Sequence, residues 1–579
     1  MMKILKKINV LLDKKQKRKM IVLLINMLIG AVLETASISL VIPVITIVIT
    51  PDAVNSNKYM RMLYDTFHMT SSSQLTVFVM LSLIAAFVFK NIFLFWQQKI
   101  LYRFIYTNQF RTSERMMKNY LRRGYEFYLN SDTAVIQRSI TSDVNNMYAL
   151  ILAVLQLISE IIIFMFLGTI LLIVDAKMTF VIASLLFVTL FVIKIIIKPI
   201  MQKAGADNQD YYSGLFKWIS QTVTGIKEVK IAGKEQYFID EYVKCGKGYV
   251  DAVQKYSIYN NTPRLLIETV CIIGMVGYML FLILNGTPMT SMLQTISVFA
   301  MAAVRLMPCA NRINNQLTSM AYFEPFFLGV SDNLQDEISD SNVDMSFAKD
   351  TDAKLEVKEN IRLENITYTY PNTEVLIFDH AEMEIPIGAA VGVVGSSGAG
   401  KTTVVDILLG LLQLREGTIY ADGIDVATKY RAWLKNIGYI PQMIFMLDDS
   451  IRKNVAFGVP EEKINEKRIW EVLKEAQLDE FVKGLPEGLD TSIGERGIRL
   501  SGGQRQRIGI ARALYNDPEV LILDEATSAL DNDTEAAIMD SINHFHGKKT
   551  LIIIAHRLQT IEKCDMIYRV EAGKAKRER

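Results

Sequence analysis

A glycine-rich run at residues 395–402 has the residue types and the spacing that bind phosphate. It reads GSSGAGKT, fits the pattern GxxxxGK(S/T), follows the apolar run AAVGVV and precedes the helix-compatible run TVVDILLGLL. The glycines let successive backbone N–H groups converge on a phosphate, Lys401 supplies a positive charge, and Thr402 can ligate Mg²⁺. The predicted nucleotide-binding residues of this loop are Gly395, Ser396, Ser397, Gly398, Ala399, Gly400, Lys401, Thr402 and Thr403.

Two adjacent carboxylates follow an apolar run farther along the chain. Residues 520–523 read VLIL and predict a buried strand that ends at Asp524, with Glu525 next. Asp524 can hold a Mg²⁺ ion beside the phosphates, and Glu525 is placed to act as the general base that activates a water molecule. The alternative interpretation of Glu525 is a solvated charge at the end of a strand.

A second stretch, LSGGQ at residues 500–504, also has the residue types of an anion-binding site. We call residues 395–402 the first grip and residues 500–504 the second grip. A helix-compatible run, RIGIARAL, follows it, and the N-terminus of a helix presents unpaired N–H groups to a negative ligand. The candidate binding residues here are Ser501, Gly502, Gly503 and Gln504. The sequence thus holds two phosphate grips, although one bound phosphate chain needs only one.

Composition and length indicate what must position these residues. The chain has 579 residues, of which 50% are hydrophobic, and a formal net charge of +2. This length predicts more than one domain, and the balanced charge gives no support for nucleic-acid binding. The four cysteines lack CxxC spacing, which argues against structural zinc or a disulfide framework. Long apolar runs are confined to residues 1–313, whereas residues 356–579 have a soluble α/β pattern.

Six apolar stretches are long enough for a helix to cross a bilayer, which takes about 20 residues. They cover residues 20–48, 74–97, 147–174, 178–200, 264–284 and 291–313. Lys and Arg gather in alternate connections, because residues 1–19, 99–146 and 201–263 hold eight each and residues 51–73 hold two. Basic loops stay in the cytoplasm, so we expect both termini and the soluble domain on the cytoplasmic side of the inner (plasma) membrane.

The two long basic connections are polar but helix-compatible. We therefore expect the membrane helices to extend past the bilayer and to turn near residues 125–135 and 213–224, where they are candidates for contact with the soluble domain. A separate cytoplasmic hairpin is the alternative. Residues 314–355 become acidic and poor in aromatics, which predicts a linker. The expected order is a transmembrane domain over 1–313, this linker, and an ATP-binding domain over 356–579.

With these motifs in this order, the chain resembles the ABC transporters of the exporter type. LSGGQ resembles the signature loop of the family, and Gln442 in IGYIPQ resembles its Q-loop glutamine. Asp531 in SALD resembles the D-loop, and His556 in IIIAHR resembles the switch histidine. Tyr370 in YTYP resembles the aromatic residue that stacks on adenine.

The resemblance implies a fold, cofactors and a partner. The fold is an α-helical membrane domain of six transmembrane helices, type I ABC exporter-like, followed by an α/β P-loop nucleotide-binding domain. The cofactors are ATP and Mg²⁺, with Gln442 joining Thr402 and Asp524 as a metal ligand and His556 joining Glu525 in catalysis. In this family two ATP-binding domains meet head to tail, so the second grip faces the first grip of the other subunit. A homodimer with two composite ATPase sites follows.

Charged residues in the membrane half are the candidates for binding cargo. Lys90, Arg264 and Arg305 stand on three different predicted spans, and three cations around one cavity suit an anion such as a pyrophosphate. The alternative is that they form ion pairs with Glu34, Glu160 and Glu268. Arg264 and Glu268 in particular are four residues apart on one helix.

Three further stretches narrow the resemblance. ETASISLVIPVITIV, RLMPCANRI and YIPQMIFMLDDSIRKNVAFG are similar to the bacterial PglK-type flippases of lipid-linked oligosaccharides, which serve protein N-glycosylation. This resemblance implies flipping of a polyprenyl-pyrophosphate-linked oligosaccharide to the outer leaflet. The alternatives are a flippase of another lipid, such as a lipopolysaccharide precursor, and an exporter of drugs or peptides. An ATP-gated channel or a regulator would belong to a different class.

Overall fold

The computed structural model describes residues 6–8, 11–39, 72–174, 176–284, 289–339, 353–525, 532–555 and 561–579. Contacts divide the chain into two compact units. The first unit comprises Met1–Leu121 and Asp132–Asp340, and the second comprises Arg122–Ser131 and Ser341–Arg579. The chain therefore leaves the helical unit for ten residues, returns to it, and leaves it again.

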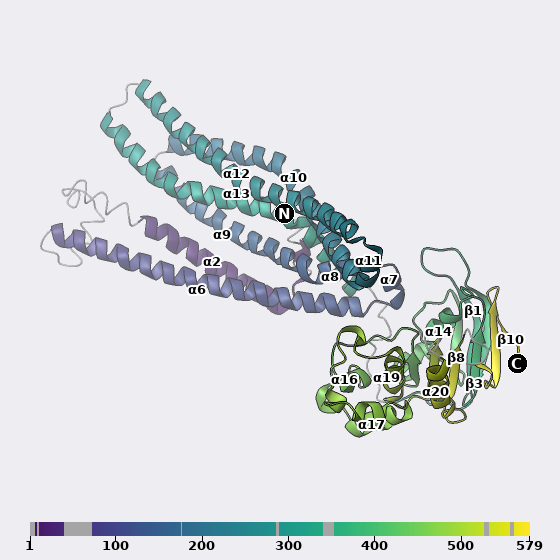
Figure 1. Ribbon diagram of the computed structural model, residues 1–579. Helices are drawn as coiled ribbons and strands as arrows, with labels where there is room; N and C mark the ends of the chain where they lie inside the picture. The colour runs from purple at the N-terminus through teal and green to yellow at the C-terminus, as the bar shows by residue number, and fades with distance from the viewer. Residues whose placement is uncertain are drawn as a thin grey trace. The chain divides into compact units, whose positions relative to one another are not determined.

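Long helices that lie side by side form the first unit (Figure 1). They are α2 (Lys14–Ser39), α6 (Ser72–Leu121), α9 (Val144–Val174), α10 (Ala176–Thr224), α12 (Glu235–Leu284) and α13 (Met289–Ser339). Short elements connect them, namely α8 (Thr133–Arg138), a π-helix at Ser139–Asp143 and α11 (Ile226–Ala232). Helix α10 packs against α12 and α13, and α13 packs against α9. A helix of 50 residues such as α6 is about 75 Å long, which exceeds the roughly 30 Å of a bilayer core.

Within the described residues, five helices are long and apolar enough to cross a membrane. They are Lys14–Ser37, Thr76–Leu121, Thr133–Thr169, Thr179–Thr224 and Glu235–Leu284. The sixth expected span, 291–313, lies on α13, and the side chains of its first part are outside the described residues. Residues 40–48 of the first expected span are also outside them.

Two boundaries differ from the expectation. The predicted linker starts at residue 314, but α13 continues to Ser339 and fully buries Phe326 and Phe327, so residues 314–339 are helical. The second turn was expected at 213–224, but α10 continues to Thr224. The chain turns later, where α11 ends at Gly233 in a left-handed conformation that glycine adopts without strain.

Two sheets and their helices form the second unit (Figure 1). The antiparallel sheet has the order β2-β1-β4-β5, built from β1 (Asn360–Tyr368), β2 (Phe378–Pro386), β4 (Glu416–Ala421) and β5 (Ile424–Asp425). The other sheet has the order β10-β9-β3-β8-β7-β6, and its strands are β3 (Ala390–Val394), β6 (Ile437–Ile440), β7 (Val520–Asp524), β8 (Thr550–Ile554), β9 (Met566–Glu571) and β10 (Lys574–Arg577). All its pairings are parallel except the one between β9 and β10.

Eight α-helices are described in this unit, and all except the first contribute residues to one of two hydrophobic clusters. They are α7 (Tyr125–Leu129), α14 (Lys401–Leu408), α15 (Tyr430–Leu434), α16 (Ile451–Val455), α17 (Glu466–Glu475), α18 (Asp479–Lys483), α19 (Gly502–Leu514) and α20 (Asn532–Asn543). Helix α14 contributes Val404 and Val405 to the cluster beneath the antiparallel sheet. Helix α19 contributes Ile508 and Leu514 to the other cluster, together with α16 and α17.

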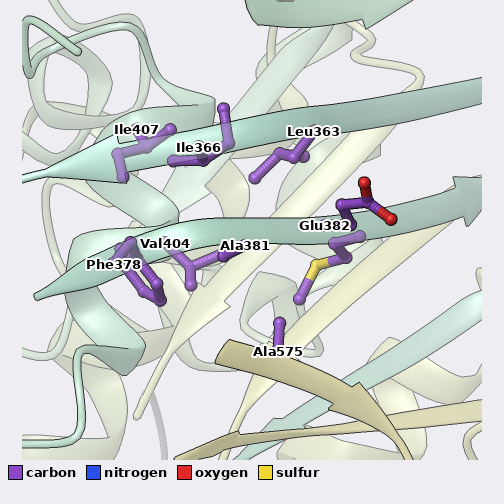
Figure 2. A pocket seen from close by; sticks show the side chains of 9 residues that line it. Leu363, Ile366, Phe378, Ala381, Glu382, Val404, Ile407 and Ala575 are labelled. Atoms are coloured by element: carbon purple, nitrogen blue, oxygen red, sulfur yellow. The ribbon is translucent and has the colours of Figure 1, made fainter. Parts of the chain in front are cut away.

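A small apolar gap lies inside the first of these clusters, between β1, β2, α14 and β10 (Figure 2). Its lining includes Phe378, Val404 and Ala575, and the exposed carboxylate of Glu382 points away from it. The gap therefore belongs to the core packing and offers nothing to a phosphate.

Candidate nucleotide-binding site

The loop between β3 and α14 has the backbone shape that phosphate binding needs. Gly398 and Gly400 have φ values of +78° and +103°, which residues with a side chain rarely adopt. A Cβ atom at Gly395 would come within 2.5 Å of the carbonyl oxygen of Val570, so that position also excludes a side chain. Strand β3 is fully buried up to Val394, and this fixes where the loop begins.

Lys401 opens helix α14 with its side chain turned into this loop. The side chain is buried, and the ammonium donates to the carbonyl oxygens of Gly395 at 3.2 Å and Ser396 at 3.1 Å. The loop therefore curls around a positive charge at the N-terminus of a helix. Both the charge and the helix end favour an anion at this position.

Asp524 and Thr402 meet at the edge of the sheet. The Thr402 hydroxyl donates to the Asp524 carboxylate at 3.4 Å, and the Tyr439 hydroxyl approaches the other oxygen of Asp524 at 3.5 Å. Burial, and then the negative charge of Glu525, raises the pKa of Asp524. Oxygen ligands around a carboxylate whose negative charge Lys401 offsets only in part fit Mg²⁺, which would supply further positive charge. Within the described residues no cluster of three His, Cys, Asp or Glu side chains forms a metal site.

Asp406 is a carboxylate of this site that the sequence analysis did not identify. It lies on α14, and burial together with the charge of Asp524 raises its pKa to about 6. The available signal was one acidic residue within the apolar run VVDILL. The approach of Asp406 to Asp524 depends on how α14 packs against β7, and a sequence pattern does not contain that information.

Glu525 follows β7 in a left-handed backbone conformation with φ of +47°. Its N–H donates to the carbonyl oxygen of Ile554 at 3.1 Å, which fixes the turn. The side-chain amide of Gln442 donates to the Glu525 carboxylate at 2.8 Å. One amide can donate through nitrogen to this base while its oxygen remains available to a metal ion.

Tyr370 lies beside the phosphate-binding helix. Its hydroxyl is 3.0 Å from that of Thr403, and its ring packs edge-on against Tyr368 at 5.2 Å between centroids. Tyr368 in turn donates to Glu126 of α7 at 3.1 Å, and Glu126 also accepts the N–H of Gln413 at 3.0 Å. The first predicted tip thus contributes a helix to the soluble unit, although the role of Glu126 was not anticipated from the sequence.

The second grip is the N-terminus of α19. Ser501 is its N-cap, and the side chains of Ser501 and Gln504 each accept the other's backbone N–H at 3.2 and 2.8 Å, forming a capping box. This box satisfies the helix from within, while Ser501 and Gly502 remain exposed. Because α19 and α14 pack into different hydrophobic clusters, the two grips are parts of different regions of the unit.

Two predicted residues, Asp531 and His556, lie outside the described residues. Strand β8 ends at Ile554, so the described chain stops one residue before His556, after Ala555. Their predicted roles in the D-loop and as the switch histidine remain predictions.

The three candidate cargo cations are in different environments. Lys90 is buried on α6, with its ammonium 4.5 Å from the centre of the Phe87 ring. Arg264 on α12 is exposed and pairs with Glu268 at 2.7 Å, the alternative that the four-residue spacing offered. Arg305 lies on α13, and its side chain is outside the described residues.

One intramembrane ion pair was not assigned from the sequence. Arg312 of α13 donates to Glu160 of α9 at 2.5 Å. The pair joins two helices that pack along their lengths, so it accounts for Glu160 as a structural residue.

The family comparisons match both units. The model of the ABC transporter transmembrane region matches residues 24–307, and that of the ABC transporter matches residues 378–528. This chain belongs to the ABC transporters. It has the exporter arrangement of that family, with the transmembrane region and the ATP-binding domain fused in one chain.

Individual relatives cover different shares of this ABC transporter. The heterocyst differentiation ATP-binding protein HepA of a Nostoc species is 31% identical over 61% of this chain and 56% of its own length. The ATP-dependent lipid A-core flippase of Photorhabdus laumondii is 41% identical over 40% of each chain. These matches span about half the length of the relatives or less. The ATP-dependent lipid A-core flippase of Desulfotalea psychrophila is 28% identical over 78% of each chain.

A solved structure agrees with the fold over nearly the whole chain. A bacterial Atm1-family ABC exporter with ATP bound superposes with a TM-score of 0.75, covering 97% of this chain and 95% of that one at 20% identity. The type I ABC exporter fold expected from the sequence is thereby confirmed.

Proposed function

We propose that this protein uses ATP hydrolysis to move a lipid-linked oligosaccharide, carried on a polyprenyl pyrophosphate, from the cytoplasmic to the outer leaflet of the inner membrane. One observation supports the proposal that ATP hydrolysis supplies the energy for transport. The side chains that ATP hydrolysis needs stand together, as Lys401 in its loop, Thr402 against Asp524, and Gln442 against Glu525. The chain that holds them also has helices suited to span a membrane.

The geometry supports a simple division of labour in hydrolysis. Glu525 accepts the proton of the attacking water while the bond from the γ-phosphorus to the β,γ-bridging oxygen breaks, which releases phosphate and leaves ADP. Lys401 and the N–H groups of its loop stabilise the charge on the phosphate oxygens. Mg²⁺, held by Thr402, Asp524 and Gln442, would offset the charge on the β and γ phosphates.

The working unit we propose is a homodimer with two composite sites. Ser501 and Gly502 are exposed at the N-terminus of α19, and their helix packs apart from α14. A second copy arranged head to tail would bring this exposed helix end to the free side of the nucleotide. ATP would then hold the two copies together, and hydrolysis would release them.

A lipid is the cargo class with the most support. Two relatives are named as ATP-dependent lipid A-core flippases, and the three stretches that resemble the PglK-type flippases add the finer assignment. Lys90 and Arg264 supply positive charge on α6 and α12, and arginine in particular suits the paired oxygens of a pyrophosphate. A lipid A-type lipid, which also bears anionic groups, is the second candidate because of those relatives.

Flipping in proteoliposomes tests the proposal. The purified protein is reconstituted with a polyprenyl-pyrophosphate-linked sugar in one set of vesicles and a lipid A-core lipid in another, with Glu525→Gln as the inactive control. Flipping of the first lipid that requires ATP and Glu525 supports the oligosaccharide assignment. Flipping of the lipid A-core lipid alone would replace that cargo with the second candidate. Ion conductance without movement of either lipid would favour a channel.

The Arg264–Glu268 pair allows a sharper test of the cation role. If Arg264 binds cargo, Arg264→Ala should reduce flipping more than basal ATPase activity, whereas Glu268→Ala should leave flipping near the wild-type rate. If the pair is structural, both single variants should lose flipping and ATPase activity together. Arg305→Ala, measured in the same two assays, extends the comparison to the third cation.

A further inference from the structure

A groove of about 160 Å³ lies between α10 and α13 in the helical unit. Its polar lining comes from both helices, with Lys194 and Lys198 on α10 and Asn314, Thr318 and Glu324 on α13. Aliphatic side chains of α10, among them Leu190 and Ile193, line it as well. None of these residues belongs to the nucleotide site or to the proposed cargo cations.

The two lysines form a positive pair on one face of α10. They are four residues apart, both are exposed, and among the described residues neither has a carboxylate within ion-pair distance. Like charges at this spacing repel each other unless an anion lies between them. The neighbouring exposed residues of α10 are large and apolar, including Phe191 at 54%, Ile195 at 59% and Ile196 at 56% exposed. This is the composition of a surface in contact with lipid chains.

Asn314 adds a polar side chain to the lining of the groove. Its side chain lines the groove and is only 3% exposed, yet its Nδ2 atom is buried without a hydrogen-bond partner among the described residues. A buried donor without a partner destabilises the folded state. A phosphate in the groove would offset the two exposed ammonium charges directly, whereas it could accept from this buried amide only after the side chain turned toward the groove.

Glu324 gives the groove a negative end. It accepts a 2.6 Å hydrogen bond from Gln202, which follows Lys198 by one helical turn on α10. In the direction in which α10 passes from its apolar segment into polar sequence, the groove presents Leu190 and Ile193, then the two lysines, and then Glu324. Ile197 lies between the two lysines, and Leu317, Met320 and Ala321 of α13 complete the lining. The charged groups therefore follow an apolar start in the order positive, then negative.

This order matches a phospholipid whose headgroup carries a phosphate followed by a primary amine. We propose that the groove binds one such aminophospholipid, of the phosphatidylethanolamine type, in the cytoplasmic leaflet. The acyl chains lie against the apolar face of α10, the phosphate lies between Lys194 and Lys198, and the ammonium lies at Glu324. The leaflet follows from the predicted orientation of the chain. The binding does not depend on which cargo the protein moves, nor on ATP.

Native mass spectrometry of the intact protein in detergent micelles tests this site without nucleotide. The protein is titrated separately with phosphatidylethanolamine and phosphatidylglycerol, and inorganic phosphate is added as a competitor. We expect phosphatidylethanolamine to bind more tightly than phosphatidylglycerol, and inorganic phosphate not to displace it. Displacement by inorganic phosphate would show that the groove takes a free anion and would overturn the lipid assignment.

Variants with matched controls locate the binding. Lys194→Gln combined with Lys198→Gln should weaken phosphatidylethanolamine binding at least about tenfold, because two charge-assisted hydrogen bonds are lost. The corresponding double replacement by Arg should keep the binding, and Lys203→Gln, an exposed lysine on the same helix, should leave it unchanged. Unchanged binding in the double Gln variant would mean that the two lysines do not bind the phosphate and are only solvated at the membrane surface. The proposal would then be wrong.

Glu324→Gln separates the two ends of the headgroup. It should weaken binding of phosphatidylethanolamine and leave phosphatidylglycerol, which has no ammonium, nearly unaffected. Equal weakening of both lipids would contradict the assigned order of phosphate and amine.

Discussion

The side-chain amide of Gln442 holds the carboxylate of Glu525 through a 2.8 Å hydrogen bond. The residue predicted to contact the metal is thereby joined to the residue predicted to activate water. A change in metal or phosphate occupancy at Gln442 would alter the position of the base directly.

Glu525→Gln removes the base and keeps a side chain of nearly the same shape that Gln442 can still contact. We expect ATP hydrolysis to fall by about 10²–10⁴-fold, the usual contribution of a general base, with ATP affinity unchanged. The matched control is Glu519→Gln, because Glu519 is exposed directly before β7 and Glu525 directly follows it. Hydrolysis measured with ATP-binding titrations checks this, and a Glu525→Gln enzyme with full turnover would rule out the assigned base.

Ser501 has two separable functions, capping α19 and facing phosphate in the proposed dimer. Ser501→Asp keeps a strong N-cap but adds a negative charge, so we expect normal thermal stability with a large loss of ATPase activity. Ser501→Ala loses the cap, at a cost of about 1 kcal/mol, without adding charge, so it should retain more activity. If Ser501→Asp hydrolyses ATP normally, the signature loop does not face the nucleotide.

Asp406 should make the nucleotide-free protein less stable as the pH rises. Burial and Asp524 raise its pKa to about 6 from 3.8, so between these pH values the folded state holds a proton that the unfolded state has released. Stability should therefore fall as the pH increases through this window. A pKa raised from 3.8 to about 6 converts to about 3 kcal/mol, and solvent screening of the partly exposed Asp406 carboxyl reduces this to about 1 kcal/mol.

The variant Asp406→Asn cannot ionise and should be the more stable protein at pH 7. Its melting temperature should also change less than that of the wild type between pH 4 and 6. Parallel curves for the two proteins would assign the pH dependence to other groups.

Arg512 joins the signature helix to the segment that follows Gln442. From α19 it donates to the carbonyl oxygens of Phe445 at 2.7 Å and Asn454 at 2.8 Å. Burial lowers its pKa to about 10, which leaves it charged at neutral pH. Arg512→Ala leaves these carbonyls unsatisfied, so we expect a stability loss of about 2–4 kcal/mol and a lower ATPase rate.

Arg507→Ala is the control for this prediction, since Arg507 lies on the same helix and makes one exposed hydrogen bond, to Gln477. Thermal unfolding and ATPase assays of both variants give the comparison. Equal losses of stability and ATPase activity in the two variants would mean that the hydrogen bonds from Arg512 to Phe445 and Asn454 contribute no more than the exposed bond of Arg507.

The sequence predicted the parts of the site that are local in the chain. The loop at 395–402 and the strand that ends at Asp524 are contiguous patterns, and both lie where they were expected. Interactions between distant segments were not predictable. The effect of the Asp524 charge on Asp406 and the hydrogen bond from Tyr368 to Glu126 illustrate this. They depend on how helices dock, which no short pattern encodes.

The helix boundary near residue 314 was missed for another reason. The predicted linker was assigned from the composition of residues 314–355 as a whole, in which the acidic residues toward 355 dominate. That range also contains FEPFFL at 323–328, an apolar run that can pack against neighbouring helices. In the structure Phe326 and Phe327 are fully buried, so a shorter window would have placed the end of the helix more accurately.

The place of residues 122–131 in the soluble unit affects how the protein can be divided for experiments. A fragment that starts after α13 would contain every strand that the structure describes and every predicted nucleotide-binding residue, and would still be incomplete. Without Glu126, the hydroxyl of the buried Tyr368 and the N–H of Gln413 would each lose an acceptor. We therefore expect an excised ATPase domain to be less stable than the same domain in the intact chain. Fusing α7 to the fragment should restore part of that stability.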